Sequence, residues 1–131
     1  MVIIKEGIGK SYLYLDPPDL LPLTFGREVM DEGSFAQLSC IVAKGDEPLQ
    51  LSWTFHGSKI SSDLGIMTAP IGTRGTMLVI SNVGHKHNGT YTCTAKNHAG
   101  KASVSTVLKV NGNKNILVGH WIYLFLYFSS S

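Results

Sequence analysis

The sequence predicts an all-β domain built as a two-sheet antiparallel sandwich. About seven short segments show strand-like alternation, with turn-forming residues every eight to twelve positions and no helical periodicity. A second observation is the set of Cys40, Trp53 and Cys93, with Tyr91 two positions before the second cysteine. These residues stand where two packed sheets need a cross-link and a buried aromatic side chain.

The spacing of these four residues is typical of an immunoglobulin-like sandwich. Only two cysteines are present, and both belong to this pattern, which favours one inter-sheet disulfide and an oxidising compartment. A cytosolic sandwich with two buried free thiols is the alternative. The pattern predicts a fold and says little about chemistry, because this scaffold hosts many unrelated functions.

The strands can be assigned in order along the chain. Pro17-Pro18 holds the entry extended, Pro22 confines the first strand to a sheet edge, and Gly26 ends it. Alternation then marks the strands that carry Cys40, Trp53 and Cys93. The expected strands are residues 20–25, 35–43, a strand around Trp53, 59–60, 66–71, 76–80, a strand through Tyr91 and Cys93, and 101–110.

We expect the segments 20–25, 35–43, 66–71 and 76–80 to form one sheet, and the strands around Trp53 and Cys93 to form the other with 101–110. Inward-facing side chains of both sheets make the core. The core residues we single out are Trp53, Tyr91 and Leu78, and the Tyr91 hydroxyl is expected to bond a backbone group a few residues upstream.

The chain divides into a flanking segment at 1–16, the immunoglobulin-like domain at 17–112 and an apolar tail at 113–131. The first 15 residues lack the apolar core and cleavage site of a signal peptide. The tail contains a 13-residue apolar and aromatic run at 116–128, about 20 Å long as a helix and short of the ~30 Å hydrocarbon core. We expect both ends to be foreign to the domain; an interfacial or aggregation-prone tail and a true membrane span are the alternatives.

Composition argues against several functions. A net charge of +2 supplies no basic stripe for nucleic acid, and a charged fraction of 15%, against about 25% on average, suits a contact surface. His85 and His87 could share one face, but without a nearby carboxylate or thiolate they would make a weak metal site. We read them as solvated corner residues, and expect no metal, no cofactor, no small-molecule substrate and no enzyme activity.

Asn88-Gly89-Thr90 is an N-glycosylation sequon, which has meaning only in a secreted chain. Asn88 is therefore the candidate glycosylation site. The alternative is that Asn88 and Gly89 serve only as turn formers before the strand that carries Cys93.

Strand parity separates two outer faces. One is richer in apolar residues, and exposed apolar patches often mark a protein-binding surface. We take it as the candidate partner face, although the strand at 66–71, a neighbouring domain or a terminal segment could cover it instead. Its residues are Phe35, Gln37, Ser39, Ile41, Met77 and Val79; the opposite face presents Gln50, Ser52, Thr54, Thr92, Thr94 and Lys96.

Two sets of residues resemble known families. The segment 93–100, Cys-Thr-Ala-Lys-Asn-His-Ala-Gly, resembles a strand and turn of intermediate-set (I-set) immunoglobulin domains of adhesion receptors and muscle proteins. The combination of Pro17-Pro18, the segment 21–26, the segment 44–49 leading to Trp53, and Asn111-Gly112 resembles the arthropod Down syndrome cell adhesion molecule family, most closely its seventh domain. His87 departs from that pattern, since many relatives carry an aspartate there.

The resemblance implies an extracellular part of a membrane-anchored receptor with tandem immunoglobulin and fibronectin type III domains. Such receptors bind copies of themselves in neuronal self-avoidance and insect immunity, and alternative exons encode variants of the seventh domain. The expected function is thus homophilic recognition, with a second copy as the partner. A structural immunoglobulin domain of an intracellular, muscle-type protein is the alternative.

Overall fold

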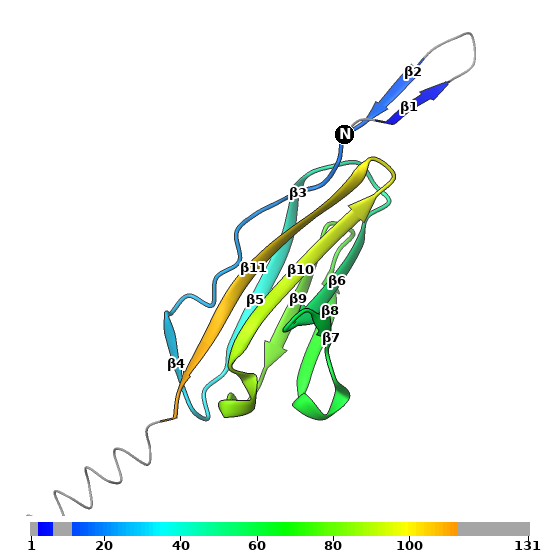
Figure 1. Cartoon of the computed structure of the whole chain (residues 1–131). Helices are drawn as coiled ribbons and strands as arrows, with labels where there is room; N and C mark the ends of the chain where they lie inside the picture. Colours follow the sequence, from blue (N-terminus) through cyan, green and yellow to red (C-terminus); the bar gives the residue numbers. More distant parts are fainter. Residues whose placement is uncertain (1–2, 7–11, 113–131) are drawn as a thin grey trace, which may run out of the picture.

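The computed structural model describes residues 3–6 and 12–112, and its main body is a sandwich of two β-sheets (Figure 1). In one sheet the strand order is β3 (Asp19–Leu20), β5 (Ala36–Lys44), β9 (Gly75–Ile80), β8 (Ile66–Ile71). In the other it is β4 (Val29–Asp31), β11 (Gly100–Asn111), β10 (Gly89–Asn97), β6 (Gln50–Phe55), β7 (Ser58–Lys59). The predicted all-β sandwich is confirmed, and, apart from the first predicted strand, each sheet holds the strands assigned to it.

The first predicted strand is the main error in the assignment. Instead of one strand over 20–25, only β3 joins the first sheet, and the chain leaves it after Leu21 donates its N–H to the Ile41 carbonyl at 3.0 Å. Pro22 has no N–H to continue the ladder, and Gly26 adopts a positive φ of 81°. The chain then crosses to the other sheet, where β4 pairs parallel to β11.

Strands β5 and β9 form the centre of the first sheet, and buried and outward-facing residues alternate along most of each strand. In β5 the residues Ala36, Leu38 and Cys40 are buried while their neighbours face outward. Leu38 pairs with Leu78 of β9, and both are fully buried. Period-two patterning on a half-buried sheet accounts for both strands.

The second sheet is organised around the long hairpin of β10 and β11, which pair over their whole common length from Gly89 with Leu108 to Asn97 with Gly100. Strand β6 adds to the other side of β10, so that Trp53 lies beside Cys93. Tyr91, Cys93 and Ala95 are fully buried.

Among the described residues before Asp16, which are 3–6 and 12–15, the structure has two strands that the sequence did not predict. Strand β1 (Ile3–Glu6) pairs antiparallel with β2 (Tyr12–Leu15) as a separate two-stranded sheet, drawn beyond one end of the sandwich in Figure 1. The string Tyr-Leu-Tyr-Leu at 12–15 carries the aromatic residues that strands favour. The apolar run predicted at 116–128 lies outside the described residues.

Candidate functional site

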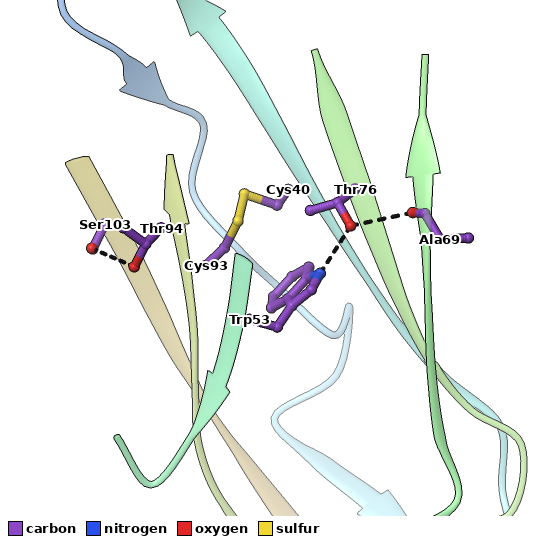
Figure 2. Close-up of a disulfide and its surroundings, with 7 residues drawn as sticks. All are labelled: Cys40, Trp53, Ala69, Thr76, Cys93, Thr94 and Ser103. Atoms are coloured by element: carbon purple, nitrogen blue, oxygen red, sulfur yellow. Dashed lines mark hydrogen bonds between the residues drawn. A yellow bond between two sulfur atoms is a disulfide. The ribbon is translucent and has the colours of Figure 1, made fainter. Parts of the chain in front are cut away.

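Two cross-links join the sheets at the same level of the sandwich (Figure 2). The disulfide between Cys40 and Cys93 connects β5 to β10, with the two Cα atoms 6.4 Å apart. Beside it, the indole N–H of Trp53 donates to the Thr76 hydroxyl at 3.1 Å, and that hydroxyl donates to the Ala69 carbonyl at 3.2 Å. The disulfide and the Trp53–Thr76 hydrogen bond lie side by side because Trp53 pairs with Cys93 in one sheet and Cys40 pairs with Thr76 in the other.

An aromatic cluster fills the core next to these cross-links. The Tyr91 ring lies 5.8 Å from Phe25 and 4.6 Å from Phe55 between ring centroids. Its hydroxyl donates to the His87 carbonyl at 2.7 Å, as the sequence predicts. Burial raises the pKa of the Tyr91 phenol, since the charged phenolate would lose its hydration.

The candidate partner face is the outer face of β5, β9 and β8. Cross-strand rows run Gln37–Val79–Met67, Ser39–Met77–Ala69 and Ile41–Gly75–Ile71. All six sequence-predicted face residues lie on this side: Phe35 is 56% exposed just before β5, Gln37 and Ser39 are exposed, and Ile41, Met77 and Val79 are half-buried.

Strand β8 extends this face rather than covering it. Met67 is 67% exposed beside Val79, and Ile71 is 37% exposed. Ile41 and Ile71 flank Gly75, where an added Cβ would come within 2.9 Å of Ile41 Cδ1 and 3.3 Å of Ile71 Cβ. The side chains of Ile41 and Ile71 therefore pack over Gly75 on the outer face. The sequence reading missed Met67 and Ile71, although alternation along 66–71 places both on the outer side.

The outer face of the other sheet has a different character. Its cross-strand rows are Thr54–Thr92–Ser105, Ser52–Thr94–Ser103 and Gln50–Lys96–Lys101. Hydroxyl groups bond one another across β10 and β11, at 2.7 Å between Thr92 and Ser105 and at 2.8 Å between Thr94 and Ser103. The contrast between an apolar and a hydroxyl-rich face, inferred from parity, is present in the folded domain.

His87 is not the solvated corner residue that the sequence reading expected. It ends the 3-10 helix η3 (His85–His87) and is 1% exposed. Its Nδ1 accepts the Gly84 N–H at 2.9 Å, so Nε2 carries the proton and donates to the Leu64 carbonyl at 2.7 Å. The ring is a structural link between η3 and the 3-10 helix η2 (Ser62–Leu64), whereas His85 is exposed. Turn composition alone could not indicate this, because Leu64 is distant in the sequence.

The Asn88 side chain is half-buried and holds η3 against β11. Its amide N–H donates to the His85 carbonyl at 3.1 Å, and its carbonyl oxygen accepts the Val110 N–H at 2.7 Å. This supports the turn-forming role considered for Asn88. Attachment of a glycan would leave the amide one N–H, and glycosylation here stays a prediction.

Asn97 is a buried polar residue whose function the sequence did not reveal. Its amide nitrogen donates to the carbonyls of Asp16 at 2.7 Å and Asp46 at 3.0 Å. Its oxygen accepts the N–H groups of Ala99 at 2.8 Å and Gly100 at 3.1 Å. One side chain thereby joins the entry segment, the loop before β6 and the β10–β11 turn, and ties Asp16 to the domain.

A metal site needs several ligating side chains close together. Within residues 3–6 and 12–112, no group of three or more His, Cys, Asp or Glu side chains could hold a metal ion. Across the same ranges, no helix is long and apolar enough to span a membrane.

The fold, the inter-sheet disulfide and the buried tryptophan define an immunoglobulin domain. The family model of the immunoglobulin I-set domain matches residues 24–110, and the chain belongs to this family. Such domains of adhesion molecules are generally not enzymes.

Its relatives are cell adhesion molecules. The chain is 34% identical over 96 residues to the cell adhesion molecule Dscam1 of Drosophila melanogaster, covering 72% of this chain and 5% of that protein. It thus spans only a small part of that relative. In structure it is similar to the Dscam1 Ig7 domain, isoform 5, with a TM-score of 0.69, 33% identity, and coverage of 72% of this chain and 97% of that one.

A weaker likeness extends to a muscle protein. The titin domains I67–I69 give a TM-score of 0.62 and 26% identity, covering 73% of this chain and 33% of that one. The predicted resemblance to the Down syndrome cell adhesion molecule family and its seventh immunoglobulin domain is confirmed. The chain is an immunoglobulin module of the adhesion-receptor type.

Proposed function

We propose that this chain is an extracellular recognition module whose partner is a second copy of itself. The observation that carries the proposal is the contrast between the two outer faces. The face of β5, β9 and β8 is apolar and partly exposed, whereas the other presents hydroxyl and lysine side chains. Contiguous apolar patches larger than a few hundred Å² are rare on monomeric domains and often mark protein-binding surfaces.

The geometry of the face suits contact between identical copies. A two-fold contact uses the same patch on both partners, so the patch must complement itself. The described side chains at its centre, Met77, Val79 and Met67, are uncharged, and methionines adapt to irregular surfaces. Two such faces can meet without leaving a charge unpaired.

The proposal includes the setting implied by the resemblance. The module is a domain at 17–112, with flanking segments at 1–16 and 113–131, in the extracellular part of a membrane-anchored receptor. Its role is recognition in neuronal self-avoidance or insect immunity, without a cofactor, nucleic acid or catalytic reaction. The muscle-type alternative is less favoured, because the titin likeness has lower identity and Cys40 and Cys93 form a disulfide.

The proposal can be tested by introducing a negative charge into the candidate partner face. Val79→Asp or Ile41→Asp should weaken self-association at least tenfold, about 1.4 kcal/mol, because dimerisation would bury an unpaired carboxylate. Analytical ultracentrifugation measures the association, and thermal unfolding checks that each variant folds.

Ser103→Asp is the matched control, because it adds the same charge to the exposed position of the opposite face. It should leave self-association unchanged. If Val79→Asp dimerised as strongly as the original chain, or if Ser103→Asp weakened association equally, the assignment of the face would be wrong.

A further inference from the structure

The four edge strands of the sandwich differ in how they are protected against pairing with another chain. Strands β3 and β7 have two residues each, and β3 also has a register irregularity. Strand β4 has three residues, ends at Asp31 and lies next to Arg27, Glu28 and Glu32. Short, charged or irregular edges are the usual means of preventing edge-to-edge pairing.

Strand β8 lacks most of this protection. Its six residues, Ile-Met-Thr-Ala-Pro-Ile, carry no charge and pair with β9 in one continuous register. Five of the six, from Met67 to Ile71, are exposed. Among the described residues, no strand pairs with β8 on its other side, so its backbone N–H and C=O groups there form an open ladder interrupted only at Pro70.

Two clefts run beside this open edge, between β8 and β6. The larger, of about 460 Å³, is lined by Pro48, Leu49 and Leu51 on one side and by Thr68 to Pro70 on the other. The smaller, of about 280 Å³, is lined by Trp53, Ile60 and Ile66. Leu51, Thr68 and Thr76 contribute to both, so the clefts follow one another along the strand. Strand β7 leaves them open, because it pairs only with Thr54 and Phe55 of β6.

The lining is apolar or neutral along most of the groove. In the larger cleft the carboxylate of Glu47 is already paired with Arg74 at 3.4 Å. In the smaller cleft Lys59 lies at the β7 end. A ligand that carried charge along the groove would meet no complementary group near Leu51 or Thr68, whereas an uncharged ligand would lose little on desolvation.

We propose that the open edge of β8 and its two clefts bind an extended, uncharged peptide segment as an added strand. The segment pairs its backbone with β8, and its inward side chains alternate in period two, as along any strand. Apolar side chains at those inward positions enter the clefts beside Leu49, Leu51 and Ile60. Among the β8 residues of the outer face, Met67 and Ile71 do not line the clefts, and only Ala69 also belongs to the larger cleft. The proposed binding does not depend on homophilic binding.

The test uses a defined peptide and the full chain. The probe is an acetylated and amidated heptapeptide that alternates threonine and valine. It is titrated into the isotope-labelled chain carrying Val79→Asp to suppress self-association, and amide chemical shifts are recorded by NMR. Shifts and slowed hydrogen exchange should concentrate at residues 66–71 and at the start of β6.

A matched control peptide carries N-methyl groups at alternate residues along each of its two edges. It keeps the same side chains, but it cannot complete the ladder of backbone hydrogen bonds with β8. It should bind at least tenfold more weakly. On the protein, Thr68→Arg should weaken binding of the unmodified peptide at least tenfold by filling the groove, whereas Ser103→Asp should leave it unchanged.

Three outcomes would overturn the proposal. One is the absence of shifts in β8 at millimolar peptide, and another is equal binding of the N-methylated control. The third is concentration-dependent protection of the β8 amides without peptide, which would make a second copy the occupant. Because the peptide comparison needs no change in the groove, the test stands even if Thr68→Arg fails to fold.

Discussion

Asn97 shows how one buried amide can determine the arrangement of one end of the sandwich. Its four hydrogen bonds use both N–H groups and both acceptor positions of the side chain. A buried polar group is stabilising only when its bonding capacity is satisfied in this way. The entry segment, the loop before β6 and the β10–β11 turn therefore depend on the same side chain.

Removal of the Asn97 side-chain amide should destabilise the folded domain. Asn97→Ala is expected to lower the free energy of unfolding by about 2–4 kcal/mol, because carbonyls of Asp16 and Asp46 and two N–H groups lose their partner. Urea unfolding measures the change, and His98→Ala, at the exposed neighbouring position, should stay within about 0.5 kcal/mol. Equal stability of the two variants would contradict the role assigned to Asn97.

Tyr91 gives a prediction about alkaline stability. Its folded-state pKa is raised by burial above the ordinary value of about 10, so the unfolded chain releases the phenolic proton first as pH rises. The free energy of unfolding should therefore fall above about pH 10. Tyr91→Phe should cost about 1 kcal/mol at pH 7, from the lost bond to the His87 carbonyl, and show a shallower alkaline decline.

Urea unfolding at pH 7 and pH 10.5 tests this, with Tyr14→Phe as the control because Tyr14 is 66% exposed. A Tyr91→Phe variant that lost as much stability at pH 10.5 as the original chain would assign the alkaline decline to other groups.

Between elements, the Thr76 hydroxyl links β6 of one sheet to β9 and β8 of the other. It accepts from Trp53 in the opposite sheet and donates to Ala69 in the neighbouring strand. Thr76→Val keeps the shape but leaves the indole N–H without a partner. We expect a loss of about 1–3 kcal/mol, whereas Thr76→Ser should retain most of the stability. If calorimetry showed the valine variant to be as stable as the serine variant, this bridge would contribute nothing.

How well each element could be predicted depends on how local its determinants are. Strands β5 and β9 follow largely from alternation within each segment, and so does the outward placement of Ile41 and Val79. Strand β8 shows no such alternation, since it is exposed from Met67 to Ile71. The split into β3 and β4 depends on which sheet accepts the chain after Pro22, and His87 and Asn97 depend on partners distant in the sequence. Open strand edges and the clefts beside β8 appear only once both sheets are assembled.

For the domain as a unit, we propose that recognition uses one outer face of a sandwich whose two sheets are linked to each other. The disulfide and the Trp53–Thr76 bond hold the sheets together at one level, and the Asn97 amide fixes one end. Such a body presents its outer faces without large rearrangement, which suits contact between preformed surfaces. The apolar face of β5, β9 and β8 is then available to a second copy.

The most direct test of homophilic recognition is sedimentation equilibrium of the chain over a wide concentration range, with Val79→Asp measured beside it. We predict a reversible monomer–dimer equilibrium for the original chain and a monomer for Val79→Asp at the same concentrations. A chain that stays monomeric throughout, or a dimer that Val79→Asp leaves intact, would contradict the account.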